Sequence, residues 1–398
     1  MKVVFVFGGL PHYLIKLLSK INESSKVEIL TISPDTRGRT IGNGVHLSDE
    51  DTAFKSIKLV EYNTWYNKPF FKNFYSTIKS ENTKIIVLGW PYFLALIFNP
   101  LLLLKLKYKK IKIIVREIPF SVPYNHESRK NFTLRCAESQ RNEKIFTSFF
   151  NFSITKLFRK LTYSFIADSA FTYTDVGIDI LASYGIDKNK IFATYNSPDT
   201  DYIFKTIKKI ESNKTSTIIK NKFRIIHVGR LVKWKNVDLL IRAVELLKPN
   251  YPEIELAIIG NGEEEGNLKE LTKSLNLTNQ IKFLGAIYEG EAQSVEFLKS
   301  GIYVLAGMGG LSINEAMCHS LTIICSIADG TEKHLVFEGV NGYYFEDGNL
   351  ESLTEAIKHV WSNDIDLLGS NSLKIIEDKI NIQIVANNFN NAFALNKN

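Results

Sequence analysis

Length, composition and charge limit what kind of protein this chain is. Its 398 residues are too many for one ordinary core and fit two domains of roughly 150 to 200 residues each. The hydrophobic content of 45% is that of a globular protein, and 23 glycines and 10 prolines are too few for a fibrous or disordered one. The net charge of +7 suits phosphorylated ligands, nucleic acid or an anionic membrane surface, and an Ile/Lys/Asn-rich coding bias explains it equally well.

The first apolar run and the cysteines indicate where the protein works. The run at the start of the chain is broken after six residues by glycine and proline, so it predicts a buried strand over 3–7 and not a secretion signal. The three cysteines, Cys136, Cys318 and Cys325, lack metal-ligand spacing and cannot all pair. We therefore expect a reducing, cytoplasmic location.

Strands and helices alternate through the first half of the chain. Further apolar strands are expected over 27–32, 85–88, 111–115, 171–174 and 191–194. Helical patterns cover 12–21, 127–164 and 176–184, and the polar segment 35–55 predicts a loop or hairpin. Apolar strands separated by helices indicate a parallel sheet with both faces covered.

Residues 91–106 raise the question of a membrane. This apolar segment carries Lys105, is interrupted by Asn99-Pro100 and is followed by a run of lysines up to Lys112. It is shorter than the roughly 20 residues of a spanning helix. Two interpretations stay open: a buried helix of the first domain, or a helix that rests one face on an anionic bilayer.

A second series of elements follows a polar segment. Residues 205–222 lack a clean hydrophobic period and predict a linker. Strands are then expected over 224–228, 256–259, 281–284, 302–305 and 321–325, and helices over 237–247, 268–275, 312–319 and 350–361. The sequence thus predicts two Rossmann-like domains, 1–204 and 223–370, with 371–398 forming a helix that returns to the first.

Two cations follow the first strand of the second domain. Gly229 and Arg230 come directly after that strand, at the sheet edge where open α/β sheets bind ligands, and Lys235 lies shortly beyond. An arginine offers a planar fork for two phosphate oxygens, and a lysine adds a point charge. The alternative is a surface arginine and a solvated lysine.

A glycine-bearing turn and a carboxylate follow a later strand. The turn 307–310 precedes a helix that opens at Leu311 and Ser312, and its backbone N–H groups suit a phosphate. Glu315 lies about one turn inside this helix, within reach of ribose hydroxyls. Alternatively, Glu315 only complements the helix dipole.

The order of these motifs resembles that of the retaining glycosyltransferases of family 4, the group 1 transferases, which have the GT-B fold. The resemblance covers 223–362 and is weaker in the first half. The matching motifs are Gly229-Arg230-Leu231-Val232 with Lys235, Ile258-Ile259-Gly260-Asn261-Gly262, Phe283-Leu284-Gly285, and Gly310-Leu311-Ser312 with Glu315-Ala316-Met317.

The resemblance implies a fold and a set of roles. It implies two Rossmann-like domains whose parallel sheets face across a cleft. Arg230 and Lys235 would hold the donor diphosphate, and Glu315 the ribose. No metal or other cofactor is expected, because the two cations would neutralise the diphosphate charge that Mg²⁺ neutralises in other enzymes. The remaining donor-side positions are Gly8, Gly9, Gly229, Gly260, Gly262, Phe283, Leu284, Gly309, Gly310, Leu311 and Ser312.

The chain departs from the family pattern at three points. The first of two glutamates spaced eight residues apart falls on Gly307, which puts the contacts with the donor sugar in doubt. The glycine after the motif lysine is Asn236, and the expected cleft histidine has no clear counterpart. Arg116 and Glu117 occupy a comparable place and would face donor or acceptor; alternatively, they form a salt-bridged strand end.

Competing functions are judged by their motifs. The glycine pattern of a dinucleotide-dependent oxidoreductase is missing after the first strand. A sugar epimerase would need cleft carboxylates and histidines, and scattered lysines argue against nucleic acid. We expect a UDP- or GDP-sugar-dependent glycosyltransferase, peripheral on the inner face of the cell membrane, that builds capsule, lipopolysaccharide or a related glycan on a polyprenyl-linked acceptor. A non-catalytic sugar-nucleotide- or lipid-binding subunit stays open.

Overall fold

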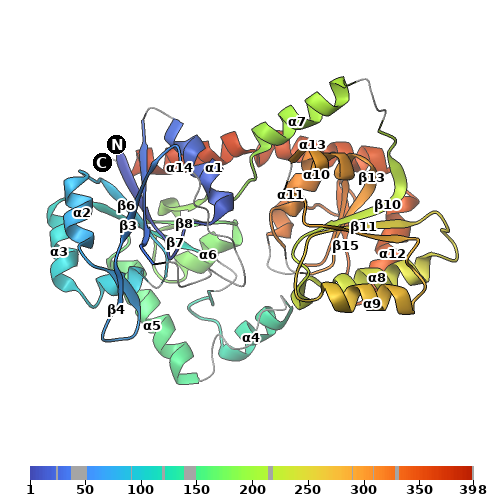
Figure 1. The fold of residues 1–398 in the computed structure, drawn as a ribbon. Helices are drawn as coiled ribbons and strands as arrows, with labels where there is room; N and C mark the ends of the chain where they lie inside the picture. The colour runs from blue at the N-terminus through green and yellow to red at the C-terminus, as the bar shows by residue number, and fades with distance from the viewer. Residues whose placement is uncertain are drawn as a thin grey trace. The chain divides into compact units, whose positions relative to one another are not determined.

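The computed structural model describes residues 1–23, 26–36, 52–90, 92–118, 122–138, 149–213, 218–288, 290–307, 309–327 and 331–396; at 12, 134–138 and 149–151 it describes the backbone alone. The chain forms two compact units (Figure 1). The first consists mainly of Met1–Thr133, Glu143–Asn196 and Ile382–Asn398, and the second mainly of Ser197–Asn381.

The first unit contains a seven-stranded parallel sheet with the order β3-β2-β1-β6-β7-β8-β9. A separate antiparallel pair joins β4 (Glu61–Asn63) to β5 (Pro69–Phe71). The strands of the large sheet are β1 (Lys2–Val6), β2 (Glu28–Pro34), β3 (Lys55–Leu59), β6 (Ile85–Leu88), β7 (Lys112–Glu117), β8 (Ser169–Thr172) and β9 (Ile191–Ala193).

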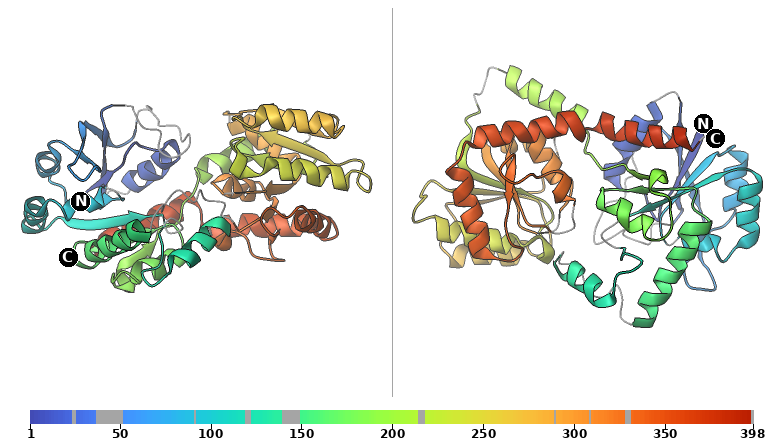
Figure 2. Two further views of the ribbon diagram at one scale, coloured as in Figure 1. Left: turned by 90° about the horizontal axis from the view of Figure 1, so that it is seen from below. Right: turned by 180° about the vertical axis from the view of Figure 1, so that it is seen from behind.

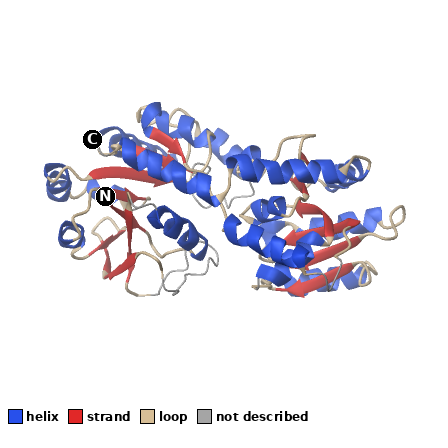
Figure 3. Cartoon of the chain, turned by 90° about the horizontal axis from the view of Figure 1, so that it is seen from above, coloured by secondary structure: helices blue, strands red, loops and turns tan. Residues whose placement is uncertain are grey.

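Helices cover both faces of this sheet (Figure 3). Because side chains alternate along a strand, Val4 and Val6 join the core on one face, while Phe5 faces Phe389 and Phe393 on the other. The helical segments of this unit are α1 (His12–Glu23), α2 (Phe74–Ser80), η1 (Phe93–Leu96), α3 (Pro100–Tyr108), α5 (Phe149–Phe165), α6 (Val176–Ala182), η4 (Lys188–Lys190) and α14 (Ile382–Leu395), and α4 (Arg129–Glu138) groups with it up to Thr133.

The second unit contains a six-stranded parallel sheet with the order β12-β11-β10-β13-β14-β15. The chain moves outward from β10 in one direction to β11 and β12, and in the other to β13, β14 and β15. The point between β10 and β13 is therefore a topological switch point, where ligands of open α/β sheets bind. The strands are β10 (Asn221–Val228), β11 (Glu255–Ile259), β12 (Ile281–Gly285), β13 (Ser300–Leu305), β14 (Thr322–Cys325) and β15 (Gly342–Tyr344).

The helices of the second unit bury apolar stripes against the sheet. In α8 the positions 237, 240, 241, 244 and 247 are all buried, which is the spacing of one helix face. The helical segments are α7 (Thr200–Ser212), η5 (Lys233–Lys235), α8 (Val237–Leu247), α9 (Glu265–Ser274), α10 (Gly290–Leu298), α11 (Ser312–Cys318), η6 (Glu332–His334), α12 (Leu350–Trp361) and α13 (Ile365–Lys379).

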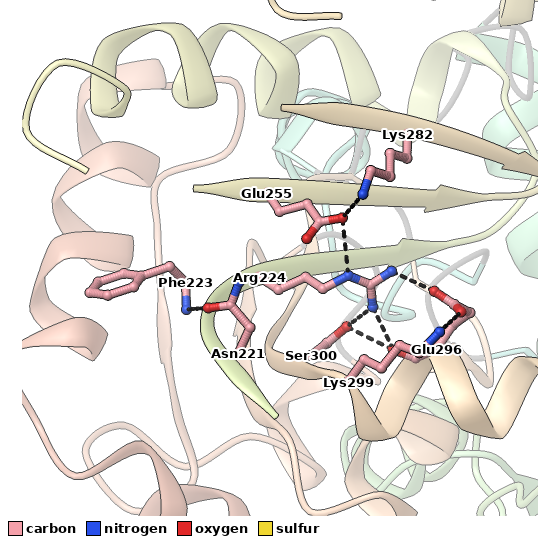
Figure 4. A network of polar contacts seen from close by, with 8 residues as sticks. All are labelled: Asn221, Phe223, Arg224, Glu255, Lys282, Glu296, Lys299 and Ser300. Carbon is pink, nitrogen blue, oxygen red and sulfur yellow. Dashed lines mark hydrogen bonds and ion pairs between the residues drawn. The ribbon is translucent and has the colours of Figure 1, made fainter. Parts of the chain in front are cut away.

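A polar network ties the start of β10 to its neighbours (Figure 4). Arg224 is buried, and its guanidinium donates to Ser300 Oγ at 2.8 Å and forms ion pairs with Glu255 and Glu296. Lys282 adds a second cation at 2.6 Å from Glu255. Every buried charge here has an opposite partner, as burial requires, so Arg224 has a structural role.

The predicted linker over 205–222 is wrong in its first part. Residues up to Ser212 belong to α7, which begins after Asp199 accepts a hydrogen bond from the Tyr202 N–H at 3.1 Å. This helix packs against α10 and α11 of the second unit. Its isoleucines Ile203, Ile207 and Ile210 have the spacing of one helix face, so the sequence does carry a helical period, although the lysines around them give the segment the composition of a linker.

Other boundaries differ from expectation as well. The segment 91–106 is not one helix. The turn η1 ends at Leu96, and Asn99 then caps α3 by accepting from the Leu102 N–H at 3.1 Å, with Pro100 in the first turn of α3. No helix within the described residues is long and apolar enough to cross a membrane. The loop or hairpin expected over 35–55 lies largely in 37–51, outside the described residues, and its last residue begins β3.

The end of the chain divides between the units. Of the expected returning segment 371–398, residues up to Lys379 belong to α13 in the second unit, and Ile382–Asn398 group with the first. The helix α14 packs against α1, and Phe389 lies 5.1 Å from Phe171, centroid to centroid.

Candidate functional site

Two glycines hold the Arg230 loop against the sheet. A Cβ on Gly260 would lie 1.9 Å from the Gly229 carbonyl oxygen, and one on Gly262 would lie 2.2 Å from that of Leu231. The Leu231 N–H donates to the Asn261 carbonyl at 2.8 Å across the same contact. Both glycines are thus required by backbone packing, and their contact with a donor stays a prediction.

Arg230 differs from the structural Arg224. Its guanidinium is half-buried, lies 5.8 Å from the centre of the Trp234 ring and forms no ion pair with the described residues. A half-buried guanidinium stacked on an aromatic ring keeps its planar donor fork available for an anion.

Lys235 joins the two predicted motifs. Its side chain is only 8% exposed, and its Nζ donates to the Gly309 carbonyl at 2.9 Å. A Cβ on Gly310 would lie 3.9 Å from the same ammonium. The cation therefore lies at the glycine turn after β13, so the sequences after β10 and β13 meet at the switch point.

His227 lies beneath this site and was not predicted. Its side chain is fully buried, and Nδ1 lies 3.1 Å from the Val304 carbonyl. Burial, together with the Lys235 charge, lowers its pKa to about 4, so the imidazole is neutral and its Nδ1–H donates to that carbonyl. Nε2 has no hydrogen-bond partner among the described residues. The available signal was a histidine flanked by the apolar residues Ile226 and Val228 at the end of a strand.

Gly307 occupies the position where the family places its first glutamate. A Cβ there would lie 2.3 Å from the Trp234 carbonyl oxygen and 2.9 Å from the Lys235 carbonyl carbon. Real side chains never approach backbone this closely. A glutamate at position 307 would therefore force these two backbone segments apart, so glycine is required here by the packing of the chain.

Glu315 is placed in the first turn of α11 and is half-buried. Burial raises the pKa of its carboxyl to about 7. Gln293 donates a hydrogen bond to Oε2 at 3.3 Å, which lowers the pKa but does not offset the effect of burial. The Ser312 hydroxyl, one turn earlier, accepts from the Tyr303 O–H at 2.7 Å. A partly exposed carboxyl with one weak partner within the described parts of the chain retains capacity to accept from a ligand hydroxyl.

The remaining donor-side positions of the second unit lie on neighbouring loops. A Cβ on Gly309 would approach the Glu332 carboxylate at 2.9 Å, and Glu332 itself is fully buried. Glu332 was not assigned a role from the sequence. Phe283 and Leu284 are half-buried and lie just before Gly285, the last residue of β12, and Lys269 Nζ lies 5.7 Å from the Phe283 ring centre. Leu311 directly precedes α11.

Gly8 and Gly9 belong to the first unit, at the carboxyl end of β1. Gly9 has a φ of 155°, and a Cβ on Gly8 would lie 3.3 Å from the Tyr92 hydroxyl. The first sheet also has a topological switch point, because the strand order runs outward from β1 to β3 on one side and from β6 to β9 on the other. Their role in capping a donor, and the cleft between the domains, stay predictions.

Arg116 and Glu117 separate in the structure. Glu117 is buried and accepts from Arg159 Nη1 at 3.0 Å and from the Tyr163 hydroxyl. The alternative interpretation, a salt-bridged strand end, therefore describes Glu117, and its expected role facing a substrate is not supported. Arg116 donates to the Tyr173 hydroxyl and lies 4.8 Å from that ring's centre.

The parts of the chain described above contain no group of three or more His, Cys, Asp or Glu side chains able to hold an ion. Cys318 and Cys325 are buried, free thiols. Metal-independent chemistry stays a prediction.

Comparison with known families gives a match that covers most of the second unit. Residues 208–375 match the family model of the glycosyl transferases group 1. An uncharacterized glycosyltransferase of Methanocaldococcus jannaschii is 33% identical over 208 residues, 49% of this chain and 52% of that protein. One of Haemophilus influenzae is 31% identical over 170 residues, 40% and 47% of the two chains. The chain thus spans about half the length of these curated relatives.

Solved structures show the same fold at low identity. Anabaena HepE, crystallised in complex with UDP, matches with a TM-score of 0.66 at 15% identity, over 99% of this chain and 100% of that one. A glycosyltransferase from Rickettsia africae matches with a TM-score of 0.66 at 16% identity, over 100% and 99%. With its two parallel α/β sheets, the chain has the GT-B fold.

Proposed function

We propose that this chain is a retaining glycosyltransferase that uses a UDP- or GDP-sugar. The observation that carries the proposal is the contact between Lys235 and the Gly309 carbonyl, because it joins two motifs at the switch point of the second sheet. Arg230 stands a few residues away without an ion pair among the described residues. Two cations at such a place suit a diphosphate.

Each side chain has a proposed task. Arg230 and Lys235 neutralise the charge that develops on the leaving nucleoside diphosphate, which is the work of a metal ion in other transferases. Glu315 accepts hydrogen bonds from the ribose hydroxyls. The incoming hydroxyl and the departing phosphate share one face of the sugar, so the anomeric configuration is retained.

The acceptor is proposed to be a glycan or a polyprenyl-linked sugar. Relatives over part of the chain include a poly(glycerol-phosphate) alpha-glucosyltransferase of Bacillus subtilis (28% identical) and a capsular polysaccharide biosynthesis glycosyltransferase of Staphylococcus aureus (25%). These names support a role in capsule, lipopolysaccharide or another surface polysaccharide. Transfer of a hexose or an N-acetylhexosamine, at the cytoplasmic side of a membrane, completes the proposal.

Gly307 favours a second candidate. Without the glutamate at this position, a protein that binds a nucleotide sugar but does not turn it over is also consistent with the site. Such a protein would act as a sugar-nucleotide-binding subunit.

One experiment separates the two candidates. Thermal shift with UDP, GDP and their sugars identifies the donor, and release of the nucleoside diphosphate is then followed with and without EDTA. A retaining, metal-independent enzyme releases nucleotide in both conditions and gives a product with the donor's anomeric configuration by NMR. Stabilisation without release supports the binding subunit, and no stabilisation by any compound overturns both.

A further inference from the structure

A large basic cavity lies in the first unit, away from the carboxyl ends of its strands. Its volume is about 1170 Å³, and it opens where β2, β6, β7 and β8 begin. Asparagines of α14, among them Asn387 and Asn391, contribute another wall. Six lysines line it: Lys26, Lys84, Lys107, Lys109, Lys110 and Lys112.

The positive charge of this cavity is hardly compensated. Asp168 is the one acidic side chain among the described residues that line it. Its carboxylate already accepts from the Ile113 N–H at 2.8 Å and pairs with Lys107 at 3.2 Å. Clustered like charges repel one another, so a bound polyanion would stabilise the cavity.

An exposed apolar helix face adjoins the lysines. The side chains of Leu101, Leu104 and Tyr108 are 69%, 65% and 84% exposed, and their spacing places them on one face of α3. Phe165 is 77% exposed and is the last residue of α5. It lies close to α3, since Lys107 Nζ donates to the carbonyl of the next residue, Ile166. Figure 2 shows α3 at the same end of the first unit as both chain termini.

We propose that the cavity and the exposed face of α3 together form a docking surface for an anionic lipid bilayer. The lysines bind headgroup phosphates, while Leu101, Leu104 and Tyr108 enter the interfacial layer. Lysine stems run along apolar surface and keep their ammonium groups at the headgroups. A free phosphate would satisfy the lysines alone, whereas a bilayer also covers the apolar face. The inference does not rest on glycosyl transfer.

Vesicle binding tests the proposal with the full chain. We expect cosedimentation with vesicles that contain phosphatidylglycerol, weakened by salt, and none with pure phosphatidylcholine. Lys26→Gln/Lys84→Gln/Lys109→Gln should lower the partition coefficient at least about tenfold, because each lysine near an anionic surface contributes to binding. The matched control is Lys205→Gln/Lys208→Gln/Lys273→Gln, which removes the same charge from exposed positions of the second unit.

A second variant tests the apolar half of the surface. Leu104→Ser/Tyr108→Ser removes exposed side chains only, so the fold should persist and vesicle binding should fall. Equal loss in the control triple would show a general charge effect and overturn the proposal. So would stabilisation of the wild type by inorganic phosphate, lost in the cavity triple, without any vesicle binding, since that identifies a site for a free anion.

Discussion

The backbone of Gly307 lies directly against that of Trp234, such that a Cβ on residue 307 would stand 2.3 Å from the Trp234 carbonyl oxygen. This contact fixes the turn after β13 to the segment that carries Lys235. Any side chain at 307 must push apart the two segments that form the candidate site.

The first prediction concerns this contact. Gly307→Ala should destabilise the protein by about 1–3 kcal/mol, the usual cost of overpacking, and should weaken nucleotide binding, since Lys235 moves with its backbone. Urea denaturation and nucleotide titration measure the two effects. Gly266→Ala is the control: it lies in α9 with open space around its Cβ, so alanine should leave stability unchanged or raise it. A neutral Gly307→Ala would contradict the close packing.

The second prediction separates Arg230 from Arg224. Arg230→Ala should weaken binding of the nucleoside diphosphate by about ten- to a hundredfold, the loss of a charge-assisted hydrogen bond, with little change in stability. Arg224→Ala should instead cost about 1–3 kcal/mol of stability, because it removes a buried guanidinium together with its bonds to Ser300 and Glu296. Calorimetric titration and denaturation measure these changes. The exposed Arg242→Ala serves as control, and equal nucleotide affinity in the variants at 230 and 242 would refute the assignment.

The strands were predictable where both faces of the sheet are buried. The run 302–305 is entirely apolar because β13 lies in the middle of a covered parallel sheet. At the edge, β3 carries Lys55 and Lys58 and is largely exposed, so its sequence resembles a loop. The helix α7 was missed although its isoleucines lie on one helix face, because the lysines around them give the segment the polar composition of a linker.

The site was predictable as a set of motifs but not as a geometry. The order of the motifs placed Arg230, Lys235 and Glu315 at strand ends and a helix start. The Lys235–Gly309 hydrogen bond depends on β10 and β13 being neighbours, which is a property of strand order. The burial of His227 and Glu332 likewise depends on what packs around them.

The third prediction concerns Glu117. Because its carboxylate is buried against Arg159 and Tyr163, Glu117→Gln should lower the free energy of unfolding by about 3–5 kcal/mol, the usual loss when a buried ion pair loses one partner. The folded Glu117→Gln variant should bind its substrates with the same affinity as the wild type. Denaturation of the variant and nucleotide titration below its midpoint check both points. A selective loss of acceptor binding at unchanged stability would restore the substrate-facing role.

The fourth prediction uses the raised pKa of Glu315. Its folded value of about 7 exceeds the ordinary 4.5, so above pH 4.5 the folded state holds a proton that the unfolded state has released. Stability should therefore fall as pH rises from 4.5 to 7, by at most about 3 kcal/mol for this half-buried group. Glu315→Gln should remove this part of the slope in a series of urea melts. An unchanged slope would mean that the carboxyl is ordinarily solvated.

The fifth prediction concerns the opposite pH limb. His227 has a folded pKa of about 4, below the ordinary 6.5, so the unfolded state takes up a proton first as pH falls. Stability should therefore drop as pH falls from 6.5 to 4. Burial also lowers the pKa of His319 to about 4, so His319 should act in the same direction. His227→Asn can still donate to the Val304 carbonyl but cannot titrate, so its melts should fall less steeply with acid. The exposed His126→Asn is the control, and it should follow the wild type; parallel acid limbs in all three proteins would show that His227 is not buried as a neutral imidazole.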